Sequence, residues 1–333
     1  MHIWIPSVRV GTGADIFAER LASGLEKHSL NVTLSWFNQL YEFMPQFLSL
    51  NSNQIQADII HANCNYGFAF SNANAKLVTT LHHNNFDSRA RKYKTFVQNI
   101  YHDYFVKKFE SKSFSVSDKT ISVSHSCLKN LDSSLFKTKP AVIYNGVNPD
   151  LFKPAQKNIN GKKFKLLFVG KPVRGKGFDL LQNIIDNLGE DFYLYYTGYG
   201  RSSELDKYSN AENIGKLVQT ELVPVYQQCD ALLFPSRNEG FGLTVCEAMS
   251  CGIPVITSNN SSLPELVSDG ETGILCDTDD VDAFANAART LAENPDTARN
   301  MGSAGRQRVL EKFTLDRMVN QYIEVYRELL DTR

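Results

Sequence analysis

The residues best placed to do chemistry are two glutamates, Glu239 and Glu247, on either side of a glycine-rich turn. The turn, Gly240-Phe241-Gly242, follows the apolar run Ala231–Phe234, which is typical of a short buried strand. A helical stretch comes next and ends at Gly252. This order places the N-terminus of a helix at the carboxyl end of a strand, where backbone N–H groups favour an anion such as a diphosphate.

These features also have purely structural explanations. Thr244 is expected to be the N-cap of the helix, and its spacing from Glu247 is that of a capping box, in which the glutamate only closes the helix start. Glycine after a strand is ordinary in a βα loop. Glu239 resists such an explanation, because it has no cation four residues later and no capping role.

The whole segment from Asp230 to Ser258 resembles a known signature. Its order, D-x-x-x-x-P-S-x-x-E-G-F-G-L-x-x-x-E-A-M-x-x-G-x-P-V, is similar to the Glu-x7-Glu pattern of retaining glycosyltransferases of family 4, which have the GT-B fold. The resemblance spans nearly the whole chain and is strongest from 140 to 310. It implies an α/β protein with two facing, Rossmann-like, doubly wound domains and an active site in the cleft between them.

Strand-like and helix-like segments alternate along the chain, which independently favours two doubly wound domains. We expect an N-terminal, acceptor-side domain over residues 1–154, a donor-binding domain over 155–314, and a C-terminal helix, about 315–333, that crosses back to the first domain. The polar segment 153–161 is the expected linker. The expected strands cover residues 2–6, 32–37, 58–62, 77–81, 120–123, 141–144, 164–169, 192–196, 231–234, 254–257 and 274–276.

The first domain carries a glycine loop and two histidines at expected strand ends. Gly11-Thr12-Gly13 follows the first strand, but Ile16 occupies the third glycine position of a dinucleotide fingerprint, so an NAD enzyme is the less favoured alternative. His61 and His82 end successive strands, where a histidine can be either structural or catalytic. The resemblance implies that Gly13 faces the donor diphosphate and that His82 approaches the donor sugar.

In the second domain, the segment from Gly170 to Gly177 follows a strand and contains glycines and cations that suit phosphate oxygens. The alternative is an ordinary charged βα loop. The family resemblance assigns Gly170, Lys171 and Lys176 to the donor diphosphate, and the backbone near Leu217 to the nucleobase.

The same resemblance implies roles for the residues around the glycine turn. Glu239 would accept hydrogen bonds from the donor sugar, and Glu247 from the ribose hydroxyls. A metal-free transferase must stabilise the departing diphosphate with fixed donors. Backbone N–H groups would join the lysines in that task; they belong to the four residues Gly240, Phe241, Gly242 and Leu243. We therefore expect no cofactor and no metal, and Asp277-Thr-Asp279 is expected to cap a helix.

Bulk properties fit a globular protein, with 42% hydrophobic and 21% charged residues. The start of the chain does not resemble a signal peptide, and the six cysteines show no metal-ligand spacing, which favours a cytoplasmic protein. Residues 1–150 carry 15 Lys and Arg against 11 Asp and Glu, a balance of +4, so this half is the one expected to meet an anionic partner.

Residues 86–114 interleave aromatic side chains with seven Lys and Arg residues and three acidic ones. One explanation is a pair of solvated helices whose aromatic residues enter the core. The other is a surface for anionic lipid head groups or a lipid-linked acceptor, which would make the protein peripheral at the inner face of a membrane. Nucleic acid is not an expected partner, because the net charge of the chain is −1.

The sequence thus predicts a retaining glycosyltransferase that moves a sugar from a nucleotide-diphosphate sugar, with UDP as the expected nucleotide. The expected acceptor is a glycan or a lipid-linked molecule in the synthesis of cell-envelope polysaccharide or lipopolysaccharide. Two alternatives remain open at this point: a sugar phosphorylase or synthase on the same scaffold, and a non-catalytic subunit that binds a nucleotide sugar.

Overall fold

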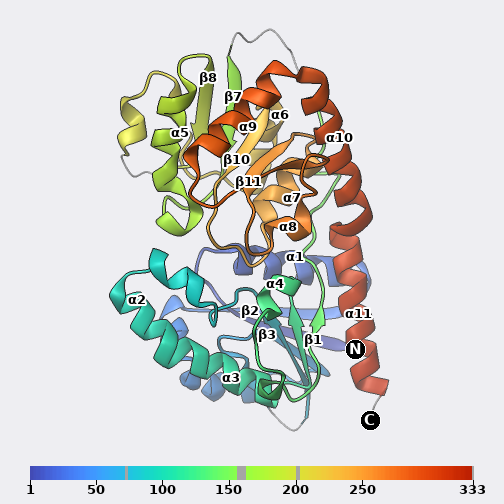
Figure 1. Ribbon diagram of the computed structural model, residues 1–333. Coiled ribbons are helices and arrows are strands. Elements are labelled where there is room, and N and C mark those ends of the chain that lie inside the picture. Colours follow the sequence, from blue (N-terminus) through green and yellow to red (C-terminus); the bar gives the residue numbers. More distant parts are fainter. Residues whose placement is uncertain (72–73, 156–162, 200–202, 332–333) are drawn as a thin grey trace. The chain divides into compact units, whose positions relative to one another are not determined.

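The computed structural model describes residues 1–71, 74–155, 163–199 and 203–331 (Figure 1). The chain forms two compact units. The first contains Met1–Asn145 and helix α11 (Leu315–Asp331), and the second contains Gly146–Thr314. Most of the expected linker, 153–161, lies outside the described residues.

The first unit is built on a six-stranded sheet of order β2-β1-β3-β4-β5-β6, in which every pairing is parallel. Because β2 and β3 lie on opposite sides of β1, the strand order reverses between β1 and β3. The strands are β1 (His2–Val8), β2 (Asn31–Phe37), β3 (Ile59–Asn63), β4 (Lys76–Leu81), β5 (Lys119–Ser122) and β6 (Ala141–Val142).

The connections of this unit are helical. Helix α1 (Gly13–Lys27) follows β1, and a long helical stretch precedes β5; this stretch consists of α2 (Phe96–Tyr101), a π-helical turn η5 (His102–Val106) and α3 (Lys107–Val116). The remaining helices and 3₁₀ turns are η1 (Gln39–Glu42), η2 (Pro45–Gln54), η3 (Gly67–Phe70), η4 (Ser88–Tyr93), α4 (His125–Leu128) and η6 (Ser133–Leu135).

Helix α11 completes the core of the first unit by packing against α1 and the sheet. Gly24 of α1 permits this close approach, since a Cβ atom there would come within 2.3 Å of the Val319 side chain. Two buried tyrosines of the same helix, Tyr322 and Tyr326, hydrogen-bond to Thr80 and His61. A helix more than 230 residues away in sequence is therefore tied to the middle of the sheet by apolar packing and by hydroxyl groups.

The second unit has the same architecture, with sheet order β12-β11-β10-β7-β8-β9 and parallel pairings throughout. Its strands are β7 (Phe164–Phe168), β8 (Phe192–Tyr196), β9 (Ala211–Asn213), β10 (Ala231–Phe234), β11 (Val255–Ser258) and β12 (Gly273–Cys276). Its helices and turns are η7 (Arg174–Lys176), η8 (Phe178–Leu180), α5 (Leu181–Leu188), η9 (Glu204–Lys207), α6 (Gln219–Gln228), α7 (Leu243–Ser250), α8 (Leu263–Leu266), α9 (Val281–Glu293) and α10 (Pro295–Lys312).

The predicted α/β class with two doubly wound, Rossmann-like units is confirmed, and each expected strand is present close to its expected bounds. Strand β9 was not predicted, because its three residues include a charged side chain and lack an apolar run. In the second unit the strand order reverses between β7 and β10. Ligands of doubly wound sheets bind beyond the carboxyl ends of the strands at such a reversal, so a ligand of this unit is expected at the loops after β7 and β10.

Candidate active site

Helix α7 begins at Leu243, directly after the loop that leaves β10. Gly242 is its N-cap, with a φ of 106° that an L side chain rarely adopts, and no side chain caps the helix. The expectation that Thr244 is the N-cap is therefore wrong, as is the capping-box explanation of Glu247. Glu247 lies in the second turn of α7, is 5% exposed, and accepts a hydrogen bond from the Tyr226 hydroxyl at 3.2 Å.

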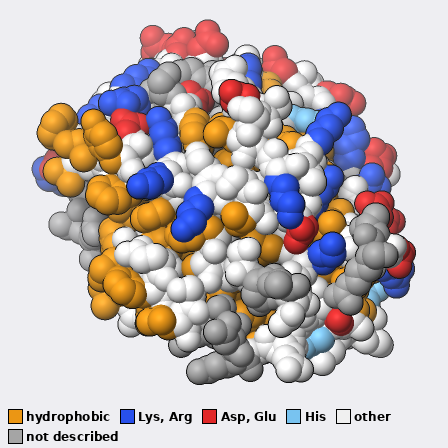
Figure 2. Space-filling view, turned by 90° about the horizontal axis from the view of Figure 1, so that it is seen from below, with side chains coloured by type: hydrophobic (Ala, Val, Ile, Leu, Met, Phe, Trp, Pro, Cys, Tyr) orange, Lys and Arg blue, Asp and Glu red, His pale blue; other side chains and the backbone are white. Residues whose placement is uncertain are grey.

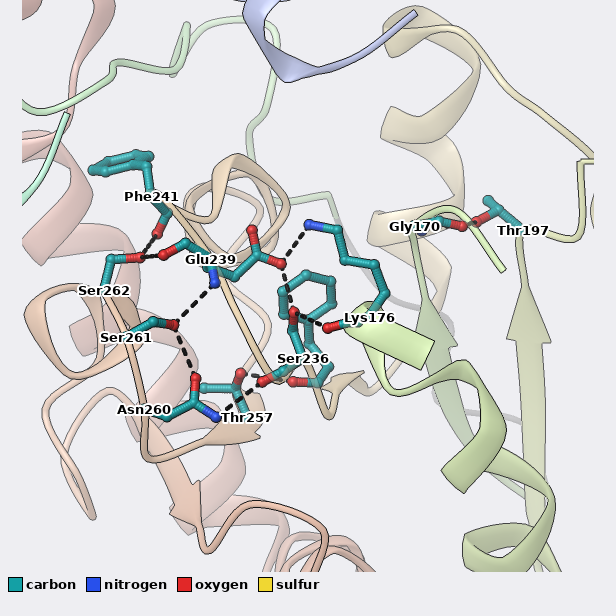
Figure 3. A network of polar contacts seen from close by, with 12 residues as sticks. Gly170, Lys176, Thr197, Ser236, Glu239, Phe241, Thr257, Asn260, Ser261 and Ser262 are labelled. Carbon is teal, nitrogen blue, oxygen red and sulfur yellow. Dashed lines mark hydrogen bonds and ion pairs between the residues drawn. The ribbon is translucent and has the colours of Figure 1, made fainter. Parts of the chain in front are cut away.

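Glu239 and Lys176 form a buried ion pair at this helix start (Figure 3). The Lys176 ammonium lies 2.5 Å from Oε1 of Glu239, whose side chain is 6% exposed. The Ser236 hydroxyl donates a second hydrogen bond to the same oxygen at 2.6 Å. Lys176 itself is 29% exposed, so one side of the pair is open to a ligand.

A glycine explains how the two loops come so close. Gly177 follows Lys176 in a left-handed conformation, with φ of 71°, and a Cβ atom there would lie 2.0 Å from the carbonyl oxygen of Pro235. No other residue type fits this contact. The Lys-Gly pair after β7 is thus held against the Pro-Ser pair after β10, and the lysine reaches the glutamate as a consequence.

The loop that carries Glu239 is held in place by hydroxyl groups that follow β11 (Figure 3). The Glu239 N–H donates to the Ser261 hydroxyl at 3.0 Å, while the buried Ser262 hydroxyl contacts the carbonyls of Glu239 at 3.1 Å and Phe241 at 2.8 Å. These serines were missed by the sequence reasoning. The available signal was the polar run Ser258–Ser262 directly after a strand end.

Arg237 was also missed, although it links three loops of the site. Its side chain is 4% exposed and contacts Asp179 at 2.5 Å, Asp279, and the carbonyl oxygen of Arg174. A buried guanidinium with several charged partners fixes the loops after β7, β10 and β12 relative to one another. The expectation for Asp277 and Asp279 needs correction, because the N-cap of α9 is Asp280, whose side chain accepts from the Ala283 N–H.

The other residues expected at the donor lie in the same unit. The N–H and the carbonyl oxygen of Gly170 both bond to the Thr197 hydroxyl at 2.8 Å, so this glycine joins the loops after β7 and β8 (Figure 3). Lys171 follows it and is half-buried. Leu217 is half-buried in the loop between β9 and α6.

Gly13 and His82 belong to the first unit. Gly13 is exposed and is the first residue of α1. The preceding loop is already closed by Asp15, whose carboxylate accepts from the N–H groups of Val10 at 3.1 Å and Gly11 at 2.7 Å. In the second unit, the structure therefore brings Lys176 together with the residues around Glu239. Gly13 and His82 lie instead in the first unit, in the segments that follow β1 and β4.

His82 follows β4 and packs its ring edgewise on Phe17, with ring centroids 4.8 Å apart. Burial, helped by the nearby charge of His83, lowers the pKa of His82 to about 3, so its imidazole is neutral at pH 7. A neutral imidazole can donate from one nitrogen and accept at the other, which suits contacts with hydroxyl groups.

His61 has a structural role in this unit. Its ring is 2% exposed and bonds to the hydroxyls of Tyr326 and Thr80, and burial lowers its pKa to about 3. A pocket of about 40 Å³ lies beside it and is lined by Asp15, Asn63 and His82 among others. This volume is enough for a few water molecules.

The loop after His82 connects to a buried acid on α3. The Asn85 amide donates a hydrogen bond to Oε1 of Glu110 at 2.8 Å. The amide oxygen of Asn85 lies 3.0 Å from Nδ1 of His102, and the Lys94 ammonium lies 3.2 Å from the same ring nitrogen. Glu110 is 1% exposed, and its Oε2 has no hydrogen-bond partner in the described part of the chain. Burial raises the pKa of Glu110 to about 8, against the opposing effects of the Asn85 hydrogen bond and of the charges on Lys94 and Lys107.

This raised pKa predicts a pH-dependent stability. Glu110 keeps its proton in the folded state up to about pH 8, but in the unfolded chain it ionises near pH 4.5. Its contribution to the free energy of unfolding is therefore complete below pH 4.5 and is lost as the pH rises towards 8. Replacing it with the neutral isostere, Glu110→Gln, should remove that loss and make the variant about 2–4 kcal/mol more stable than the parent at pH 8.

Urea unfolding at pH 4.5, 6 and 8 measures this difference, with Glu311→Gln on the exposed face of α10 as the matched control. The control should follow the parent protein at every pH. Parallel pH profiles for the parent and Glu110→Gln would show that the carboxyl is ionised in the folded state.

Among residues 1–71, 74–155, 163–199 and 203–331, no group of three or more His, Cys, Asp or Glu side chains is arranged to hold a metal ion. The six cysteines all lie in the described part of the chain, are buried, and form no disulfide there. No helix in the described chain combines the length and the apolar character needed to cross a bilayer.

Two doubly wound parallel sheets with flanking helices are the architecture of the GT-B class of proteins, to which this fold belongs. Residues 150–308 match the family described as "Glycosyl transferases group 1", and residues 10–151 match "Glycosyltransferase Family 4". The chain belongs to this group 1, family 4 type of glycosyltransferases.

A relative and two solved structures show the extent of the similarity. An uncharacterised glycosyltransferase of Methanocaldococcus jannaschii is 32% identical over 221 residues, which are 65% of this chain and 61% of that protein. Sucrose-phosphate synthase from Thermosynechococcus elongatus superposes with a TM-score of 0.87 at 21% identity, over 100% of both chains. Anabaena HepE in complex with UDP and glucose superposes with a TM-score of 0.75 at 18% identity, over 97% of this chain and 98% of that chain. The last two share the fold.

Proposed function

We propose that this chain is a retaining glycosyltransferase that transfers a sugar from a UDP-sugar to a glycan or lipid-linked acceptor of cell-envelope polysaccharide or lipopolysaccharide synthesis. The observation that carries the proposal is the buried Lys176–Glu239 pair at the start of α7. It places a cation, an acid and a helix N-terminus within one small region at the strand reversal of the second unit.

The chemistry follows from where charge develops. When the anomeric bond of the donor breaks, the departing diphosphate gains negative charge, which fixed donors must stabilise. We assign Lys176, Lys171 and the N–H groups at the start of α7 to this task, because the first N–H groups of a helix have no acceptor within it. The diphosphate would share the Lys176 ammonium with Glu239.

The two glutamates take the hydroxyl groups. Glu239 is held by Lys176 and Ser236 through Oε1, and we assign hydrogen bonds from the donor sugar to its carboxylate. Glu247, already fixed by Tyr226, receives the ribose hydroxyls. His82 contributes a neutral imidazole for a sugar hydroxyl. The assignment of UDP is supported by HepE, whose structure holds UDP and glucose.

A thermal-shift screen of UDP-, GDP- and ADP-sugars tests the donor. A ligand at 100 times its Kd stabilises the folded state by about 2.7 kcal/mol, which corresponds to an increase in Tm of about 5 °C or more for units of this size. We expect that increase with one UDP-sugar, and its loss in Lys176→Ala. A shift with GDP- or ADP-sugars only would reassign the nucleotide. Phosphate-dependent release of sugar from a disaccharide would favour a phosphorylase, and binding without transfer would favour a non-catalytic subunit.

We propose that the reaction proceeds without a metal ion, since lysines and backbone N–H groups supply the positive charge. EDTA in large excess over trace metal ions, on the order of 10³-fold, should therefore leave the transfer rate within about twofold of its starting value. Strong inhibition by EDTA that Mn²⁺ or Mg²⁺ reverses would contradict this part of the proposal.

We also propose that the protein works in the cytoplasm, at the inner face of a membrane. Six buried cysteines without a disulfide among the described residues suit a reducing compartment. Fractionation of cells into cytosol, membrane and periplasm would test this location.

A further inference from the structure

Large apolar side chains are exposed in an unusual concentration on the first unit. Of those in the described chain, all but Val173, Val218 and Leu310 come from two segments. We call them the apolar patch; its members are Leu40, Phe43, Met44, Phe47 and Leu50 from the η1–η2 segment, and Phe96, Val97, Ile100, Tyr104 and Phe105 from α2 and η5. Exposure reaches 79% at Phe96 and 76% at Leu50. A contiguous surface of this kind marks an interaction site.

The two segments are neighbours in space, so the patch is one surface. The Tyr101 hydroxyl donates to the carbonyl oxygen of Glu42 at 3.0 Å, and the rings of Phe43 and Tyr101 lie 5.5 Å apart. Figure 2 shows apolar side chains gathered at the left of that view, with Lys and Arg side chains beside them.

The helical segments turn a different face to the core. Val106, Glu110 and Phe114 are buried, whereas Phe96, Ile100 and Tyr104 recur every four residues on the exposed side. A capping box formed by Thr95 and Gln98 fixes the start of α2, so the exposed aromatic residues sit on a helix with a defined beginning. The patch is therefore a built surface and does not consist of residues from a frayed end.

The charges around the patch favour an anionic occupant. Arg91 and Lys92 precede α2, and Lys107, Lys108 and Lys112 follow η5. Asp103 is the acid within the α2–η5 stretch, and it is paired with Arg91 and Lys107, the latter at 2.7 Å. Lys108 and Lys112 are exposed, and no unpaired acid of α2 or η5 offsets their charge.

An apolar surface beside cations matches the interface of a bilayer that contains anionic lipids. Aromatic and aliphatic side chains enter the acyl boundary, while lysines remain among the head groups. A second copy of the chain fits less well, because two such surfaces would bring like charges together.

We infer that the apolar patch and its flanking lysines dock this protein on an anionic bilayer surface, with α2, η5 and the η1–η2 segment lying in the interface. The inference that the protein docks on a bilayer is argued from the exposed residues alone. The further inference that docking brings the protein to a lipid-linked acceptor rests on the proposed function. The contact between Asn85 and His102 of η5 joins the docked elements to the loop that follows His82, so the acceptor-binding side of the unit is held close to the lipid.

Co-sedimentation of the full chain with sucrose-loaded vesicles tests the inference. We expect binding to phosphatidylglycerol–phosphatidylethanolamine vesicles at least about tenfold stronger than to phosphatidylcholine vesicles. Phe96→Ser and Phe47→Ser, one from each segment, should each weaken binding about tenfold. Leu310→Ser, an exposed apolar residue of the second unit, is the matched control and should bind like the parent. Lys108→Glu with Lys112→Glu should weaken binding to the anionic vesicles only.

Circular dichroism and the Tm increase with UDP-sugar confirm that each variant is folded. Vesicle binding that is equal in Phe96→Ser, Phe47→Ser and Leu310→Ser would overturn the inference. So would a dimer, seen by sedimentation velocity without lipid, that the patch variants abolish while vesicle binding stays unchanged. If the unmodified protein binds vesicles but does not bind any UDP-sugar, the result would count against the proposed function and not against the docking.

Discussion

Lys176→Ala is expected to lower kcat/KM for sugar transfer by about 10²–10³-fold, which is about 2.7–4 kcal/mol of transition-state stabilisation. The ammonium group lies 2.5 Å from the Glu239 carboxylate, at the strand reversal of the second sheet. Its charge becomes most valuable when the diphosphate departs, because a fixed cation stabilises developing charge without reorganisation. The affinity for free UDP should fall in parallel.

Arg174→Ala is the matched control for this experiment. Arg174 lies in the same 3₁₀ turn, but its side chain is 70% exposed and lies 3.7 Å from Asp179. A change in kcat/KM of less than about threefold is expected there, since exposed ion pairs contribute little. Wild-type turnover in Lys176→Ala, or equal losses in the two variants, would show that the diphosphate does not depend on Lys176.

Glu239→Gln is the prediction with the second largest effect, and it separates two roles of the pair. The substitution keeps the shape but removes the charge that accepts from Lys176 and Ser236. Transfer should fall by about 10²-fold, because the amide is a weaker acceptor for a sugar hydroxyl. Affinity for free UDP should stay the same or rise, because Lys176 is released from its carboxylate partner.

Isothermal titration calorimetry with UDP, together with initial rates of transfer, measures the two effects. Glu271→Gln, on an exposed loop of the same unit, should behave like the parent in both. The double variant of Lys176 and Glu239 should lose less activity than the product of the single losses, because the two side chains act as a unit. Weaker UDP binding in Glu239→Gln, or fully additive losses, would contradict the separation of roles.

Local patterns in the sequence were enough for the fold class. Apolar runs such as Ala231–Phe234 predict buried parallel strands, because both faces of such strands are covered by helices. The glycine turn before Leu243 predicted a helix start after a strand, which the structure confirms. The choice of Thr244 as the N-cap was wrong, since the backbone of Gly242 already makes the turn and the helix begins two residues earlier, at Leu243.

The apolar patch could be predicted only in part. Residues 86–114 were singled out by their aromatic and basic composition, whereas the η1–η2 segment was not. Its apolar residues at positions 40, 43, 44, 47 and 48 have a spacing that fits a core-facing helix. Burial decides otherwise, because Leu48 is fully buried while Phe47 is 48% exposed.

The sequence by itself determined the order of strands and helices, the glycine turn and the residue types around Glu239, because each depends on neighbours within a few positions. Only the tertiary structure decided which of these residues meet. Lys176 reaches a glutamate 63 residues away, and Arg237 joins Asp179 to Asp279, because β7, β10, β11 and β12 are brought side by side in that sheet. These distances are set by the order of the strands in the sheet and by the close contact at Gly177, and no periodic pattern in the sequence indicates either of them.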